Sequence, residues 1–251
     1  MLKRRIIPIE LLSNGRLVKT CSFTQPRDVG DPVQSSKVYS DQDADELILL
    51  NIDQDRRSID SLAETLSKIA EHCFVPLTAG GGVVSVHDAS KLFGAGADKI
   101  IINSLAYHNI AALTEIAVRY GSQAVVAGID VNSVNDTFKL YSDCGRVQEQ
   151  LSLEDHIEKV IAAGAGELMI QSINRDGMMN GFDIELLRKV VLVSTIPVIV
   201  ASGAGNFMHI KEAFDFGADA VACGSLFNFG DNNPLRAKAF LKNYDIPLKK
   251  I

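Results

Sequence analysis

Small residues that suit a phosphate group follow apolar segments in both halves of the chain. Glycines let an anion approach backbone N–H groups closely, and the N-terminus of a helix adds the positive end of its dipole. Gly82 recurs as Gly203 at an offset of 121 residues (203 − 82), and Ser104 recurs as Ser225 at the same offset. One such cluster could equally be a set of tight turns, but its duplication predicts two binding sites for a substrate with two phosphates. The members are Gly81, Gly82, Asn103 and Ser104 in the first half, and Ser202, Gly203, Gly224 and Ser225 in the second.

The repeat extends beyond these clusters. The segment GADKIIINS begins at Gly96 and GADAVACGS begins at Gly217, again 121 residues apart (217 − 96). A repeat that keeps its register over such a length indicates the duplication of a half-domain rather than a short solenoid unit. We therefore expect a single domain, 1–251, made of two half-barrels of approximately 1–121 and 122–251.

The elements that must position these residues alternate between strands and helices. Eight strand–helix units with an internal half repeat predict one (β/α)8 barrel of the α/β class, which typically takes about 250 residues. An open doubly wound sheet would leave the repeat unexplained. Helix starts are expected at Asp31, Ser85 and Ser152, a loop at 12–31 and a small hairpin at 137–142. The predicted strands are 5–11, 46–52, 75–79, 99–103, 124–130, 167–171, 198–201 and 220–223.

Composition argues against several classes of partner. The net charge is −6 and the basic residues are scattered, so we expect neither a nucleic acid nor a membrane as a partner. The four cysteines show no Cys-x-x-Cys spacing, which favours free thiols in a reducing cytoplasm. The five histidines form no His-x-His or His-Glu-x-x-His grouping, so we expect no metal centre and assign no cofactor.

Several motifs together resemble one enzyme family over essentially the whole chain. They are RIIPIELL with Gly15-Arg16 and Lys19, GGG at 80, GADK at 96, GSQAVV at 121, SINRDGMMNG at 172 and SGAG at 202. This combination is similar to the cyclase subunit of imidazole glycerol phosphate synthase, a lyase of histidine biosynthesis. The resemblance implies a (β/α)8 barrel that binds a bisphosphorylated ribulosyl formimino aminoimidazole carboxamide ribotide. It also implies a glutaminase partner that supplies ammonia, and release of imidazole glycerol phosphate and the aminoimidazole carboxamide ribotide.

The resemblance assigns roles to individual residues. Asp130 matches one member of the acid–base pair of the family, Lys19 matches a lysine in the loop that closes over substrate, and Asp176 and Gly177 match site residues, with Gly177 at a phosphate. The other acid–base position falls on Leu11, which cannot transfer a proton. Side chains alternate along a strand, so Glu10 should point to the helix layer and cannot replace it. Two further departures are Asn51 for an aspartate and Glu149-Gln150 for Thr-Gly.

The opposite end of the barrel should carry a different set of charges. By resemblance Arg5, Glu46, Lys99 and Glu167 form a gate for ammonia, and the neighbouring Asp98 faces the glutaminase. Alternation along the strand independently places Lys99 at the bottom of the barrel if Asn103 lines the top. A purely structural layer of salt bridges is the alternative for these four residues.

Two hypotheses of different class follow. The first is a working cyclase in which Asp130 carries most of the proton transfer. The second is a paralogue that keeps the glutaminase and the channel but passes ammonia to a separate enzyme that amidinates a bacterial surface-polysaccharide sugar. Leu11 and Asn51 favour the second hypothesis. An isomerase barrel acting alone would leave the predicted gate unexplained.

Overall fold

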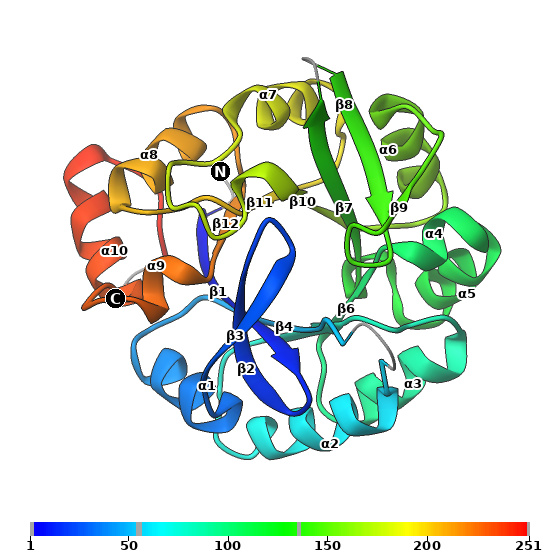
Figure 1. Ribbon diagram of the computed structural model, residues 1–251, viewed down its shortest axis with the longest axis horizontal. Coiled ribbons are helices and arrows are strands. Elements are labelled where there is room, and N and C mark those ends of the chain that lie inside the picture. Colours follow the sequence, from blue (N-terminus) through cyan, green and yellow to red (C-terminus); the bar gives the residue numbers. More distant parts are fainter. Residues whose placement is uncertain (1–2, 54–56, 135–136, 250–251) are drawn as a thin grey trace.

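Eight parallel strands form a closed barrel in the computed structural model, which describes residues 3–53, 57–134 and 137–249. Neighbouring strands follow the order β10-β11-β12-β1-β4-β5-β6-β7, and pairing of β10 with β7 closes the ring (Figure 1). The predicted (β/α)8 architecture is therefore confirmed. The barrel strands are β1 Arg5–Ser13, β4 Leu47–Asn51, β5 Leu77–Gly80, β6 Lys99–Ile102, β7 Val125–Val134, β10 Glu167–Ser172, β11 Val198–Ala201 and β12 Ala220–Cys223.

Helices surround the barrel as an outer ring (Figure 1). The three predicted caps are confirmed, because Asp31, Ser85 and Ser152 each accept a hydrogen bond from a backbone N–H three residues later. The α-helices of the described residues are α1 Pro32–Asp41, α2 Ile59–Ala70, α3 Val86–Gly94, α4 Ser104–His108, α5 Ile110–Tyr120, α6 Leu153–Ala162, α7 Ile184–Val193, α8 Phe207–Asp215, α9 Ser225–Asn228 and α10 Pro234–Leu241. Short 3-10 turns are η1 Ser122–Ala124, η2 Ile173–Arg175 and η3 Lys242–Tyr244. Within residues 3–53, 57–134 and 137–249, none of the helices is long and apolar enough to cross a membrane.

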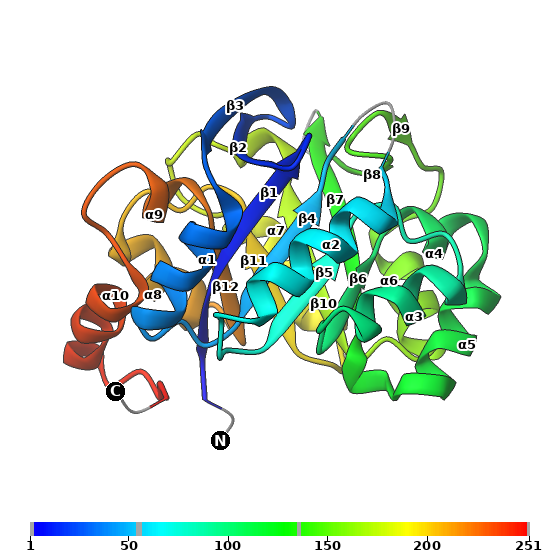
Figure 2. The same ribbon diagram turned by 90° about the horizontal axis from the view of Figure 1, so that it is seen from below.

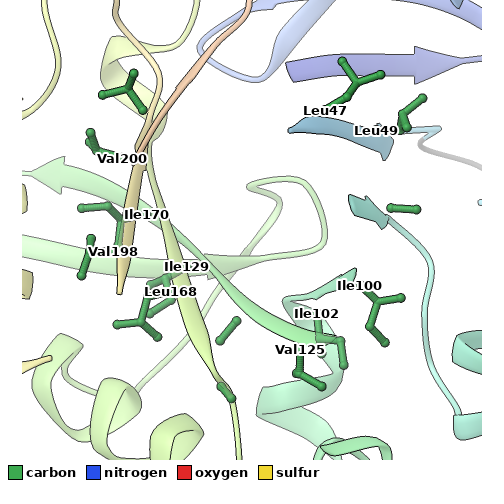
Figure 3. Close-up of a cluster of buried hydrophobic side chains, with 14 of the residues drawn as sticks. Leu47, Leu49, Ile100, Ile102, Val125, Ile129, Leu168, Ile170, Val198 and Val200 are labelled. Atoms are coloured by element: carbon green, nitrogen blue, oxygen red, sulfur yellow. The ribbon is translucent and has the colours of Figure 1, made fainter. Parts of the chain in front are cut away.

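Apolar side chains pack on both faces of the barrel wall. The larger cluster lies between strands and helices and includes Leu47, Ile100 and Val200 (Figure 3). A smaller cluster fills the barrel interior with side chains such as Ile7, Val126 and Met169, all fully buried. Strands covered on both faces read as continuous apolar runs, which explains why their positions were visible in the sequence.

The expected loop at 12–31 is wrong, because most of this segment is a β-hairpin. β1 continues to Ser13 and turns at Asn14 and Gly15, which both have positive φ, into β2 Arg16–Cys21. Asn-Gly is the preferred pair for a two-residue hairpin turn, so the signal was present in the sequence. β3 Thr24–Gly30 then pairs with β2. The expected hairpin at 137–142 is confirmed as β8 Thr137–Ser142, which pairs with β7 and with β9 Val147–Gln148.

The offset of 121 residues recurs in the structure. α8 begins at Phe207 and α3 at Val86 (207 − 86), and the bounds of β5 and β11, and of β6 and β12, match at the same offset. The aspartates of the repeated motif also act alike: Asp98 Oδ2 accepts from Leu77 N at 2.8 Å and Asp219 Oδ2 from Val198 N at 3.0 Å. Each therefore holds the start of the preceding strand. The division at residue 121 stays a prediction.

Candidate functional site

A cavity of about 810 Å³ opens at the carboxyl ends of the strands. It is lined by the whole first cluster, namely Gly81, Gly82, Asn103 and Ser104, together with Asp130, Asn51 and Leu11. A smaller pocket beside it is lined by the second cluster, Ser202, Gly203, Gly224 and Ser225, together with Lys19, Asp176 and Gly177. Leu11, Thr20 and Gln171 line both hollows, so the two clusters lie on either side of one barrel mouth.

Packing alone accounts for the glycines at key positions of both clusters. Gly81 has φ +90°, and a Cβ there would lie 2.0 Å from the Asn51 carbonyl oxygen. Gly203 has φ +109°, and a Cβ there would lie 2.2 Å from the Gly181 carbonyl oxygen. Both conformations and both close approaches require glycine without any ligand. The turn interpretation and the phosphate interpretation are therefore compatible, and phosphate binding stays a prediction.

Asp130 lies inside β7 and lines the large cavity. Its carboxyl group is buried, and burial, with a further contribution from the charge of Asp176, raises its pKa to about 7. A carboxyl group with this pKa exchanges protons at neutral pH, as a general acid or base must. The geometry and the electrostatics of Asp130 thus fit the predicted chemistry.

Leu11 lies in β1, two residues before its end, is half-buried and lines the same cavity as Asp130. Its neighbour Glu10 is fully buried on the other face of the strand, where Ser36 Oγ of α1 donates to Glu10 Oε2 at 2.7 Å. The prediction that Glu10 points to the helix layer is confirmed. Burial disfavours the charged form of Glu10 and so raises its pKa. Because its side chain lies on the helix side of the strand, this carboxyl group does not reach the mouth.

Lys19 lies in β2 rather than in a loop, which corrects the expected placement. Its side chain is buried and Nζ donates to the Ile9 carbonyl oxygen at 2.8 Å. Burial lowers the pKa of Lys19, while the nearby carboxyl groups of Glu10 and Asp176 act in the opposite direction. A Cβ at Gly224 would lie 2.9 Å from Nζ, so the ammonium group is adjacent to the second cluster. The sequence alone did not associate Lys19 with that cluster.

Asp176 holds the β2–β3 hairpin against the loop after β10. Its carboxylate accepts from Thr20 Oγ1 at 2.6 Å and from Phe23 N at 3.1 Å. Burial raises the pKa of Asp176, and these two hydrogen bonds oppose the rise. The next residue, Gly177, has φ +71°, and a Cβ there would lie 2.2 Å from the Thr20 carbonyl oxygen. Contact with the hairpin therefore accounts for both residues, and a role in substrate binding stays a prediction.

Four charged side chains meet at the opposite end of the barrel. Arg5 Nη1 lies 2.6 Å from Glu46 Oε1, and Arg5 also pairs with Glu167. Lys99 Nζ lies 3.0 Å from each of the same two carboxylates. We name this arrangement of Arg5, Glu46, Lys99 and Glu167 the charge ring. The four predicted residues are thus brought together with balanced charge, whereas their role as a gate stays a prediction.

Asp98 is exposed beside the charge ring, next to Lys99 in the chain. Its bond to Leu77 N gives it a structural function within the barrel, but one face of the residue remains open to solvent. The predicted contact with a partner is compatible with that exposure.

The two further departures that the resemblance implies lie in different places. Asn51 is buried at the end of β4, where its Oδ1 accepts from Asp53 N at 2.9 Å. Glu149 and Gln150 line a separate surface hollow, and Glu149 Oε1 accepts from Ser142 Oγ at 2.5 Å. Asn51 therefore changes the mouth directly, while Glu149 contacts the β8 strand beside it.

Sequence reasoning missed Arg57 and Asp143, which form an ion pair at the rim of the large cavity. They are separated by 86 positions in the chain, and neither belongs to a motif that predicts the other. All four cysteines fall within the described ranges and are free thiols.

Comparison with known proteins agrees with this architecture. Residues 5–233 match the family model described as "Histidine biosynthesis protein". The protein named imidazole glycerol phosphate synthase subunit HisF from Chloroherpeton thalassium is 38% identical over 250 residues, covering 99% of this chain and 100% of that protein. The protein of the same name from Hyphomonas neptunium is 39% identical over 252 residues, with 100% of both chains covered. On its barrel, its clustered strand-end residues and these similarities, the chain belongs to the HisF family of histidine biosynthesis proteins.

Proposed function

We propose that the chain is the synthase subunit of a glutamine amidotransferase, which takes up ammonia through the charge ring and uses it at the barrel mouth. The observation that carries this proposal is the charge ring at the end of the barrel opposite Asp130. Side chains of Arg5 and Lys99 are 21% and 19% exposed, so the ring is accessible from outside while its carboxylates are buried. A structural layer of ion pairs alone would not need that accessibility.

The interior between the two ends is apolar. Ile7, Val126 and Met169 belong to the cluster inside the barrel. A small neutral molecule that moves from the ring to the mouth would therefore meet apolar side chains and no charged group of this cluster. Ammonia is neutral when deprotonated, and a charged ion would lose its hydration in such surroundings. The apolar interior therefore supports passage of ammonia rather than ammonium.

The relatives are named for the synthesis of imidazole glycerol phosphate. The substrate proposed for the mouth is the bisphosphorylated ribulosyl formimino aminoimidazole carboxamide ribotide, converted to imidazole glycerol phosphate with release of the aminoimidazole carboxamide ribotide. The first and second clusters on either side of the mouth would hold its two phosphates, and Lys19 would add a positive charge at the second. Asp130 would exchange the proton during addition of ammonia and ring closure.

The proposed partner is a glutaminase bound at the charge-ring end. Asp98 and Lys99 lie beside each other there, and Asp98 is exposed. Charge reversal at Asp98 would place a positive charge where the proposed glutaminase would contact a negative one. Lys99→Glu would in addition break the ion pairs of the charge ring. Unchanged binding and unchanged coupling of glutamine hydrolysis to ammonia use in both variants would contradict this part of the proposal.

A second candidate function is favoured by Leu11. With an apolar side chain at the end of β1, the mouth holds Asp130 without the carboxylate that the family pairs with it. In this candidate the chain forms the complex and conducts ammonia, but a separate enzyme amidinates a surface-polysaccharide sugar.

The test is turnover of the bisphosphate substrate by the unmodified chain with an ammonium salt and no glutaminase. Full cyclase turnover would support the first candidate and remove the argument from Leu11. Binding of a glutaminase without turnover would support the second. Absence of both activities would overturn the common proposal.

A further inference from the structure

The two hairpins that rise over the barrel mouth share an unusual turn (Figure 2). In the β2–β3 hairpin Ser22 and Phe23 have φ of 48° and 59°, and in the β8–β9 hairpin Asp143 and Cys144 have φ of 52° and 56°. The pairs are 121 residues apart (143 − 22). Because positive φ is uncommon outside glycine, this agreement indicates that each half of the barrel uses the same turn.

Each turn forms hydrogen bonds or an ion pair with residues of the other half. In the first hairpin, Ser22 N donates to the Asp176 carbonyl oxygen at 3.0 Å and Phe23 N donates to its carboxylate. In the second, Asp143 forms an ion pair with Arg57, and Asp143 N donates to Ser104 Oγ at 3.1 Å. The second turn is therefore fastened directly onto a member of the first cluster.

Arg57 packs against the same cluster. A Cβ on Gly82 would lie 2.8 Å from the Arg57 Cβ, and both residues line the large cavity with Ser104. The position 121 residues further is Met178, but Arg175 packs against the second cluster in a similar way, since a Cβ on Gly203 would lie 3.1 Å from the Arg175 Cβ. The second cluster also has Lys19 nearby. The first cluster thus has a cation of its own, held at its edge by an internal carboxylate.

We propose that Arg57 is a side-chain ligand for the anionic group bound at the first cluster, and that the Asp143 carboxylate competes with that group for Arg57. The inference rests on the proposed function, because it takes a phosphate group as the anion. A guanidinium group matches a phosphate with two parallel hydrogen bonds, as it matches a carboxylate. The guanidinium group of Arg57 is engaged by the Asp143 carboxylate, so an entering anion takes the place of that carboxylate. Ser104 Oγ accepts from Asp143 N, so its hydroxyl can still donate to the anion.

The displaced carboxylate keeps a partner. Arg146 Nη2 lies 2.9 Å from Asp143 Oδ2, so Asp143 remains paired with Arg146 after it leaves Arg57. The other carboxylates lining this cavity are Asp53 and Asp130. Asp53 accepts from Ser13 Oγ and Asn14 N at 2.8 Å. Among the described residues, Arg57 forms its ion pair with Asp143 and not with Asp53 or Asp130. When the bound anion replaces the Asp143 carboxylate at Arg57, both Arg57 and Asp143 therefore still have a partner of opposite charge.

The experiment titrates the whole protein with inorganic phosphate and follows the backbone amide resonances by NMR. Separate resonances report on binding at each of the two clusters. The reporters are Gly82 and Ser104 for the first cluster, and Gly203 and Ser225 for the second. Arg57→Ala is expected to weaken phosphate binding at the first cluster by about 10-fold, the loss of one charge-assisted contact, and Arg57→Lys by less. Asp143→Asn is expected to tighten binding there several-fold, because the competitor loses its charge. None of the three variants is expected to change phosphate binding at the second cluster.

Arg119→Ala and Asp215→Asn, at exposed positions on helices, serve as matched controls for the loss of a positive and a negative charge. Phosphate binding at the first cluster that is unchanged in Arg57→Ala, or weakened in Asp143→Asn, would overturn the inference and leave the proposed function standing. If neither cluster of the unmodified chain responds to phosphate, the bisphosphate substrate fails, and the inference fails with it.

Discussion

Thr20 Oγ1 donates a hydrogen bond of 2.6 Å to Asp176 Oδ2, which joins the hairpin after β1 to the loop after β10 across the barrel mouth. The two residues are 156 positions apart, so the bond connects the two halves of the chain. Because Asp176 also accepts from Phe23 N, one carboxylate fixes both a strand and the turn that follows it. The conformation of this hairpin, and with it the position of Lys19, depends on that carboxylate.

Thr20→Val should therefore destabilise the hairpin and the whole fold. Valine keeps the shape but leaves Asp176 with one fewer donor, at a cost of about 1–2 kcal/mol in the free energy of unfolding. The pKa of Asp176 should rise further, because the lost bond stabilises its charged form. Urea unfolding measures the first effect and carbon-detected titration of the carboxyl group the second. Thr24→Val, at an exposed hairpin position whose Oγ1 bonds Cys21 O, is the control and should leave the pKa of Asp176 unchanged.

Removal of one cation from the charge ring should be costly. In Lys99→Met the carboxylates of Glu46 and Glu167, both largely buried, retain only Arg5 between them. Breaking a buried ion pair at one partner costs about 3–5 kcal/mol, and the partial exposure of this ring reduces that to about 2–3 kcal/mol. Thermal or urea unfolding checks the value. Adding Glu167→Gln should recover part of the loss, since the charges balance again, and a double variant as unstable as Lys99→Met would contradict the balance argument.

Lys68→Met is a suitable comparison, because Lys68 pairs with Glu64 on the surface of α2. Exposed pairs of this kind contribute little to stability. A loss in Lys68→Met as large as that in Lys99→Met would show that burial of the ring has no special effect.

The sign of the pH dependence follows from the raised pKa of Asp130. The folded protein holds the proton of Asp130 up to about pH 7, while an unfolded chain releases it near the ordinary value of about 3.8. The contribution of this group is therefore unchanged below pH 3.8 and becomes progressively destabilising as the pH rises to 7. Asp130→Asn should increase the free energy of unfolding at pH 8 by on the order of 2–4 kcal/mol, and should have little effect at pH 4.

The same variant should abolish any proton transfer by Asp130, so stability and activity should change in opposite directions. Unfolding curves at the two pH values measure the stability difference. Asp60→Asn, at an exposed position of α2, is the control and should show no such difference between pH 4 and pH 8. An Asp130→Asn variant that is less stable at pH 8 than the unmodified chain would contradict the burial argument.

Periodicity predicted those features that depend on neighbours in the chain. Alternation along β1 placed Leu11 toward the mouth and Glu10 toward α1, and the repeat placed Ser104 and Ser225 at equivalent helix starts. The strands β2 and β3 were not predicted, because the segment 12–31 is polar and contains glycine, although Asn14-Gly15 carries the signal for the turn between β1 and β2. The Arg57–Asp143 pair could not be predicted, because it depends on how far two hairpins and loops reach across a closed barrel, which no local pattern encodes.

The last prediction concerns Leu11, which lines the same cavity as Asp130 and stands where the family pattern has its second carboxylate. A positioned acid or base contributes about 10²–10⁴-fold to a rate, so Leu11→Asp should raise ammonium-dependent turnover of the bisphosphate substrate above that of the unmodified chain. The gain should fall short of the full factor, because Asn51 also differs at this mouth and residues that act together are not additive. A second carboxylate facing the cavity should also raise the pKa of Asp130 further, moving the pH optimum upward.

Leu11→Asn is the control, since asparagine has the size of aspartate but cannot exchange a proton. Equal turnover by Leu11→Asp and Leu11→Asn, with substrate binding intact in both, would show that the missing carboxylate does not limit the reaction.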